Sequence, residues 1–216
     1  MQLFFHYNRI MNKDILIYPT YFPSISHYIA MINADSITFE VEDTFQKQTN
    51  RNRMYIYSPN GIQMLNISVK HDSAKANFKD IKIDNQYNWQ KNHFKSLEAA
   101  YKNSPFYEYF VDDLRPLFEK KHEFMLDLNF EIFKLVNEAL GISIPFEKTT
   151  EYFHEVTDKT DFRYLVNGKK DKTQIEPYTQ VFDDKHGFLN NLSILDLLFN
   201  EGRYAVNYLK QQRLLF

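Results

Sequence analysis

The stretch DILIYPTYFPSISHYIAMINADSITFEVE, residues 14–42, is the strongest indication of the fold class. Its apolar run 14–18 predicts a strand, and residues 36–42 alternate apolar and polar side chains as a half-buried strand does. Between them, the proline-containing loop 19–23 precedes a helical segment, 25–34, with Ser24 at its N-cap position. A strand, loop, helix and strand in this order predict an α/β fold, Rossmann-like in the N-terminal half.

The remaining segments predict one domain, 1–216, with a mixed central sheet and flanking helices. Residues 59–61, Pro-Asn-Gly, have the composition of a hairpin turn between two strands, and the Gly141 position ends a long helix. Residues 1–10 are interpreted as an optional N-terminal extension before Met11. The segments expected are strands 54–58, 63–70 and 80–84, and helices 88–103, 115–140, 193–202 (with Ser193 and Asp196 as a capping box) and 203–212.

Composition restricts the function classes. The net charge is −2 and the two signs are interspersed, which predicts no nucleic-acid partner. No stretch reaches membrane-spanning length and the N-terminus lacks a signal peptide, so we expect no membrane insertion and a cytoplasmic location. Cysteine is absent, which excludes thiolate nucleophiles and thiolate metal sites. Aromatic residues make up 17% of the chain and are expected to dominate its core.

Standard catalytic signatures are missing. The sequence has neither a glycine-rich phosphate loop nor a G-x-S-x-G motif, and its histidines never occur at the i,i+2 or i,i+4 spacing of metal sites. We therefore expect no metal, and the sequence does not identify a cofactor.

The segment QKQTNRNR, residues 46–53, contains no apolar side chain although it follows a strand. If it stays extended, Lys47, Arg51 and Arg53 share one face with Thr49, and the two arginines can grip a carboxylate or phosphate with forked hydrogen bonds. Two other interpretations stay open: a solvated edge, and an internal ion pair with the nearby acidic residues 40–43.

Two histidines are candidate catalytic residues. His27 lies at the start of the first predicted helix, where unpaired backbone donors could meet a ligand at the carboxyl end of a strand. His93 shares one side of its helix with Trp89, and a core role is open for it too. The loop matches the F-x-P-x-H-x-G-H signature of nucleotidyltransferases only in part, because with Pro23 aligned the histidine positions fall on Ile25 and Tyr28.

Several segments together resemble the WbqC-like family, particularly its Bacteroidetes-type members. The resemblance rests on YPTYFPSISHYIAMINAD, QKQTNRNRMYIYSPNGIQMLNISV, NWQKNHFKSLEAAYKNSPFYEYF and YTQVFDDKHGFLNNLSILDLLFNEG, in this order along the chain. It implies an acyl or aminoacyl (glycine-type) transferase of surface polysaccharide (O-antigen-like) biosynthesis. His27 stands where many relatives carry an aromatic residue, and so does Asn50. The recurring elements of the family correspond here to Gln46, Lys47, Gln48, Arg51, Arg53, Trp89, Gln90 and His93.

The residues and the resemblance point to one pocket for a small anionic or sugar substrate. Lys47, Arg51 and Arg53 would position it, and His93 or His27 would move the proton. Tyr21 in the first loop is a further substrate-binding candidate. Two other functions are considered: a non-catalytic binding or scaffold protein of envelope assembly, whose surface aromatics would cover a partner or form a homodimer, and a nucleotidyltransferase-like enzyme.

Overall fold

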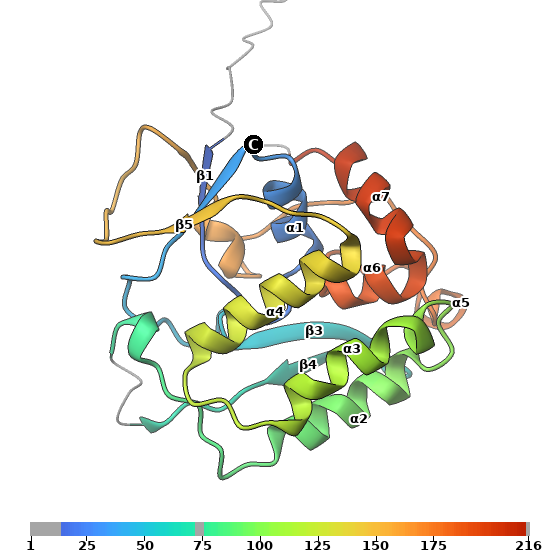
Figure 1. Cartoon of the computed structure of the whole chain (residues 1–216). Helices are drawn as coiled ribbons and strands as arrows, with labels where there is room; N and C mark the ends of the chain where they lie inside the picture. The colour runs from blue at the N-terminus through green and yellow to red at the C-terminus, as the bar shows by residue number, and fades with distance from the viewer. Residues whose placement is uncertain (1–13, 72–75, 215–216) are drawn as a thin grey trace, which may run out of the picture.

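The computed structural model describes residues 14–71 and 76–214, so the expected extension at 1–10 lies outside the described residues. Its central sheet has four strands in the order β5-β2-β1-β6, and every pairing is parallel (Figure 1). Ile15 of β1 pairs with Ile37 of β2 and with Thr160 of β6. The strands are β1 (Asp14–Ile17), β2 (Ser36–Phe39), β5 (Phe146–Lys148) and β6 (Thr160–Asp161).

The antiparallel strands form a second sheet. β3 (Arg53–Ser58) and β4 (Gly61–Asn66) make a hairpin whose turn is closed by Gly61 at φ +94°, a value that favours glycine. The predicted α/β class is thus confirmed, with its parallel and antiparallel pairings divided between two sheets. The strand predicted at 80–84 is wrong, because a 3₁₀ turn, η2 (Phe78–Asp80), is followed only by isolated bridges.

One predicted helix is two helices. α3 ends at Glu119 and α4 begins at Met125, although the sequence predicted a single helix over 115–140. The buried His122 explains the break, since its Nε2 donates to the carbonyl of Leu117 in the last turn of α3 at 2.8 Å. The helices are α1 (Ile25–Ile32), α2 (Trp89–Tyr101), α3 (Tyr107–Glu119), α4 (Met125–Leu140), α5 (Asp183–His186), α6 (Ile194–Glu201) and α7 (Ala205–Gln211), with 3₁₀ turns η3 (Arg163–Val166) and η4 (Gly202–Tyr204).

The capping predictions hold in part. Gly141 ends α4 in the left-handed conformation, as expected. Ser193 caps α6 by accepting from the N–H of Leu195, but Asp196 does not complete a capping box, since its carboxylate turns inward to Tyr101 and Tyr178. Ser24 occupies the N-cap position of α1 without making a side-chain capping bond. Its hydroxyl is therefore available for other contacts.

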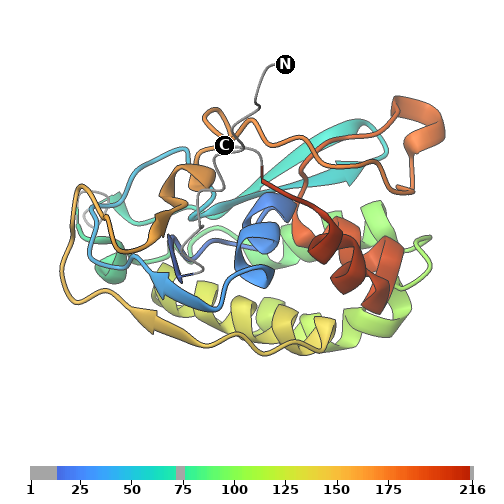
Figure 2. The ribbon, with the colours of Figure 1, turned by 90° about the horizontal axis from the view of Figure 1, so that it is seen from above.

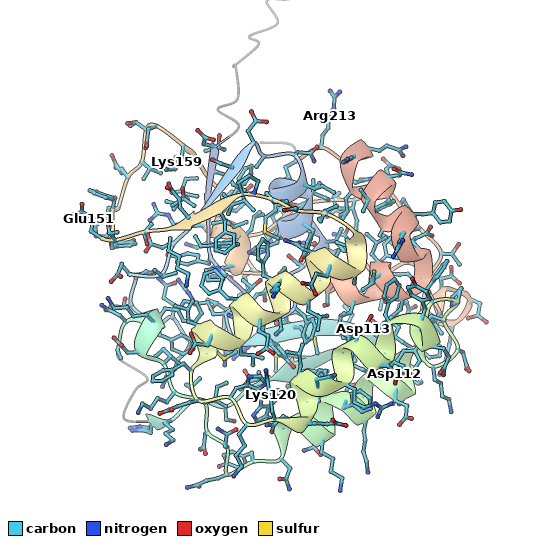
Figure 3. The ribbon with its side chains drawn as sticks, in the orientation of Figure 1. Asp112, Asp113, Lys120, Glu151, Lys159 and Arg213 are labelled. Atoms are coloured by element: carbon cyan, nitrogen blue, oxygen red, sulfur yellow. The ribbon has the colours of Figure 1, made fainter. Side chains whose placement is uncertain are left out.

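The elements pack in layers around one core. Figure 2 shows α4 along one side of the molecule, the hairpin and the region around residues 165–190 along the other, and α1 between them. Phe39 at the end of β2 contacts Phe130 and Phe133 of α4 with ring centroids 5.3 and 5.1 Å apart. Asp112 and Asp113 of α3 project from the outer surface (Figure 3). Polar groups are buried mainly beyond the carboxyl ends of the parallel strands, where the candidate site lies.

Candidate functional site

The segment 46–53 does not have the extended conformation on which the shared face of its basic residues depended. Residues 47–52 form turns and bends, and Gln48 has a φ of +63°. The side chains at 46–48 are exposed, whereas those at 49–52 are buried. The backbone of Asn50 accepts from the N–H of Tyr21 and donates to the carbonyl of Val166. The polar segment therefore ties the loop after β1 to the segment after β6, and Arg51 and Arg53 do not share a face.

Arg51 belongs to a buried ionic cluster. Its side chain is 0% exposed, and its Nη2 lies 2.9 Å from Asp43 Oδ2, which also accepts from the Tyr18 hydroxyl at 2.5 Å. The guanidinium carbon lies 3.8 Å above the Tyr18 ring. Burial raises the pKa of Tyr18 and lowers the pKa of Arg51. The internal ion pair, one of the alternatives left open by the sequence, is thus observed for Arg51.

A pocket of about 350 Å³ lies between the hairpin and the carboxyl ends of β1 and β6. β1 continues through α1 to β2 on one side and pairs with β6 on the other, so this is the point where the strand order reverses. Open α/β sheets hold their ligands at such a point. The pocket is lined by Ser24, Gln48, Asn50, Arg53, Tyr55, Ile62, Asn167, Gly168, Lys169, Asp171, Asn190, Asn191 and Leu192.

Three side chains form a hydrogen-bonded chain behind Ser24 on the pocket wall. Ser24 Oγ lies 3.0 Å from His27 Nδ1 and 2.9 Å from Ser26 Oγ. Ser26 Oγ donates to Asp171 Oδ2 at 2.6 Å, and Asn191 Nδ2 donates to the same oxygen at 2.7 Å. All four residues are buried, Ser26 and His27 almost completely, whereas Ser24 and Asp171 keep a small exposed fraction and line the pocket. The chain therefore connects the pocket with the interior.

Burial lowers the pKa of His27 to about 4, opposed by the nearby charge of Asp171. His27 is thus a neutral imidazole near pH 7. The expectation of unpaired backbone donors at the start of α1 does not hold for two of its residues: the N–H of Ile25 donates to the carbonyl of Leu192, and that of Ser26 donates to Asn191 Oδ1. These two backbone donors are therefore not free to meet a ligand.

Three other candidate residues, Tyr21, Trp89 and His93, form a second cluster that does not line this pocket. Tyr21 OH lies 2.8 Å from His93 Nδ1, and the rings of both contact Trp89. Burial lowers the pKa of His93 to about 4. Gln90, half-buried on the same helix, donates to the carbonyl of Lys120. The structure thus brings Gln48, Arg53 and, through Ser24, His27 together. It places His93 and Trp89 in the core, Arg51 in the ionic cluster, and Gln46 and Lys47 on the surface.

Sequence reasoning missed the wall contributed by residues 167–171 and 190–192. Asp171 lies in NGKKDK, residues 167–172, whose composition is typical of a turn and indicates no site. The one local signal is the pair Asn190-Asn191, because Asn tolerates the left-handed conformation and Asn191 has a φ of +55°.

The WbqC-like protein family matches residues 18–174. The chain belongs to this family. The matched range contains every residue that lines the pocket except those at 190–192. Rv1507c of Mycobacterium tuberculosis, an uncharacterised protein, is 24% identical over 238 residues, covering 94% of this chain and the whole of that protein. No solved structure matches the chain.

Two further classes of site were considered. In residues 14–71 and 76–214, no three His, Asp or Glu side chains are grouped as metal ligands. Within the same ranges, no helix has both the length and the apolar character needed to cross a membrane.

Proposed function

We propose that the chain is an acyl or aminoacyl transferase, with glycyl as one such group, that modifies a sugar of surface polysaccharide biosynthesis in the pocket beside β1 and β6. The observation that carries the proposal is the position of Ser24. It lies on the wall of a polar pocket at the reversal of strand order and is hydrogen-bonded to a neutral His27. A serine hydroxyl that is exposed to a polar pocket and oriented by an imidazole can take part in acyl transfer.

The pocket also has donors suited to an anionic or hydroxyl-rich substrate. Arg53 uses its Nε to bond Asn66 Oδ1 at 3.2 Å, and its Nη1 and Nη2 have no hydrogen-bond partner among the described residues. Such a fork matches a carboxylate or a phosphate. Lys169, Gln48 and Asn50 add a further charge and two amides, and Tyr55 and Ile62 add apolar surface. This division of polar and apolar groups is common in small-molecule sites.

The test is ligand-induced stabilisation. We expect sugars bearing a carboxylate or phosphate, or aminoacyl donors, to raise the melting temperature, since a ligand at 100 times its Kd adds about 2.7 kcal/mol. Arg53→Ala should remove the effect of an anionic ligand. Lys47→Ala is the matched control, because it also removes a basic side chain but at an exposed residue that does not line the pocket. This variant should retain the stabilisation by an anionic ligand. Equal loss in both variants, or no shift with any ligand of these classes, would count against the proposal.

One observation favours the second candidate, a non-catalytic scaffold. On β4, at the edge of the two-stranded sheet, Ile62 is 58% exposed and Met64 is 47% exposed. Exposed apolar side chains on an edge strand suit a partner segment that adds a further strand. Met64→Lys would place a charge on this strand. If this variant lost partner binding but kept its ligand-induced stabilisation, the result would favour the scaffold over the transferase.

A further inference from the structure

We propose that Ser24 is the nucleophile that carries the acyl group, and that Ser26 and Asp171 accept its proton. This inference rests on the proposed transferase function and assigns the covalent step of that function. It follows from the arrangement of hydrogens along the chain that joins His27, Ser24, Ser26 and Asp171.

The four hydrogen-bonded side chains allow only one placement of their hydrogen atoms when Asp171 is a carboxylate. A carboxylate only accepts, so the Ser26 hydroxyl donates to Asp171 Oδ2. Ser26 Oγ then accepts from Ser24, which uses the only hydrogen of the Ser24 hydroxyl. The contact between Ser24 Oγ and His27 Nδ1 must therefore be a donation from Nδ1–H.

The other nitrogen of His27 agrees with this arrangement. With the hydrogen on Nδ1 of a neutral ring, Nε2 carries none. Nε2 is buried and has no hydrogen-bond partner among the described residues. A buried N–H without an acceptor would be the costlier alternative, because an unsatisfied buried donor costs its full desolvation. His27 is thus a positioning residue that holds Ser24 Oγ from the interior side.

The acceptor end of the hydrogen-bond chain is held by donors on both carboxylate oxygens. Asp171 Oδ2 accepts from Ser26 and Asn191, and Oδ1 accepts from the N–H of Thr173 at 3.0 Å. These donors fix the orientation of the carboxylate. Since Asp171 also lines the pocket, it can exchange a proton with a bound substrate as well as with Ser26.

The reaction balances with an activated acyl ester as donor. Ser24 Oγ attacks the acyl carbon, its proton passes to Ser26 Oγ, and the Ser26 proton passes to Asp171. The bond between the acyl carbon and the leaving oxygen breaks, and Asp171 returns the proton to the departing alcohol. In the second half an acceptor hydroxyl attacks the Ser24 ester and gives its proton to Asp171, while Ser24 leaves and regains a proton through Ser26.

The full chain treated with p-nitrophenyl acetate tests this step. We expect the intact mass to increase by one acetyl group at Ser24, located by peptide mapping and removed by hydroxylamine. Ser24→Ala should lose this label. Ser24→Cys should regain it as a thioester, which keeps the test valid if the alanine variant does not fold. Ser36→Ala, at a half-buried hydroxyl that bonds Asp14, is the control and should be labelled at Ser24 as the wild type is.

The rate of Ser24 acetylation distinguishes the proton acceptors, Ser26 and Asp171, from the positioning residue, His27. Ser26→Ala and Asp171→Asn should slow acetylation by at least about 10²-fold, the ordinary contribution of proton transfer. His27→Ala should also slow it, whereas His27→Asn, which replaces the Nδ1 donor with an amide N–H, should restore much of the rate. Equal slowing in both His27 variants would overturn the positioning role.

The outcomes distinguish this inference from the proposed function. If ligand-induced stabilisation depends on Arg53 but no acetyl group is found on Ser24, the nucleophile assignment is wrong and the transferase proposal stands. If neither is observed, both are wrong. Acetylation that persists at another site in Ser24→Ala, at the wild-type rate, also overturns the assignment.

Discussion

At the scale of single residues, Arg51 and Arg53 show how local backbone geometry separates two identical side chains. The turns and bends at 47–52 direct Arg51 inward, against Asp43 and Tyr18, and leave Arg53 at the start of β3 facing the pocket. A buried charge is tolerated when its partner and its hydrogen bonds are fixed by the surrounding structure. One arginine therefore serves the fold, and the proposal gives substrate binding to the other.

The two arginines should differ in their effect on stability. Arg51→Ala removes the partner of the buried Asp43 and should lower the free energy of unfolding by about 3–5 kcal/mol. Arg53→Ala, at a half-buried position with one side-chain hydrogen bond, should change it by about 1 kcal/mol or less. Urea unfolding monitored by circular dichroism measures both. Similar losses in the two variants would contradict the assignment of Arg51 to the ionic cluster.

His27 and His93 predict a dependence of stability on pH. Burial lowers both pKa values to about 4, from the ordinary histidine value of 6.5. The groups facing them are Asp171 beside His27, and Tyr21 and the Asn66 backbone beside His93. Between pH 6.5 and 4 the unfolded chain binds more protons than the folded chain, so stability is complete above this window and falls as the pH is lowered through it. The slope is at most about 1.4 kcal/mol per pH unit for each histidine.

Urea titrations at several pH values in this window measure the slope. His27→Asn and His93→Gln should each make it shallower. His71→Gln, at an exposed histidine, is the control and should keep the wild-type slope. A slope that all three variants leave unchanged would mean that the acid sensitivity arises from other groups.

The sequence indicated which polar residues are important, but it indicated their interaction partners only where these are close in sequence. The acidic cluster near 46–53 indicated an ion pair for an arginine, because the partners are close in sequence. Asp171 was not connected with Ser26, since these residues are 145 positions apart and belong to the segments that follow the paired strands β6 and β1. No pattern within either segment reports that contact.

At the scale of elements, periodicity predicted most helices and misplaced their ends. The pattern at 115–140 stays apolar on one side, so it does not show that His122 turns back to the end of α3. The strand at 14–17, the helix after it and the strand at 36–39 were predicted because their signals are local. The separation of the hairpin from the central sheet was not predictable, because strand pairing is set by long-range packing.

The hydroxyl of Tyr101, the last residue of α2, links that helix to β3 and to α6. It accepts from the N–H of Tyr57 in β3 and donates to the buried Asp196 of α6. Tyr101→Phe removes the partner of the Tyr57 N–H and of Asp196 Oδ1, although Asp196 Oδ2 keeps its bonds from Tyr178 and Gln180, and should cost roughly 1–3 kcal/mol. Tyr107→Phe is a matched control, because both rings contact Phe199, at 5.1 and 5.2 Å, but the Tyr107 hydroxyl has no hydrogen bond among the described residues. Thermal unfolding should show little change for this control, and equal losses would contradict the role of the Tyr101 hydroxyl.

At the scale of the whole molecule, the pocket is a product of chain topology. Its walls come from the loop after β1, the hairpin, the segment after β6 and residues 190–192. These segments are far apart in sequence and converge because β6 returns to the free side of β1. The crossover connection to β6 thus creates the pocket, and the loop residues determine which side chains a ligand in it would contact.

The same convergence predicts that the described chain unfolds as one unit. One contiguous hydrophobic core includes residues of the central sheet, the hairpin and the helices, from Ile15 in β1 to Leu209 in α7. Domains that share one core unfold cooperatively. The single tryptophan, Trp89, is 4% exposed and reports on packing, whereas far-UV circular dichroism reports on the helices.

We therefore expect the urea transitions followed by Trp89 fluorescence and by circular dichroism to coincide. Tyr101→Phe should move both midpoints by the same amount, because its hydroxyl bonds groups of the hairpin and of α6, two elements of the shared core. Two separate transitions, or a shift in the fluorescence midpoint alone, would mean that the hairpin and α2 fold apart from the parallel sheet. The pocket between them would then be an interface between two domains, and its shape would depend on how those domains dock.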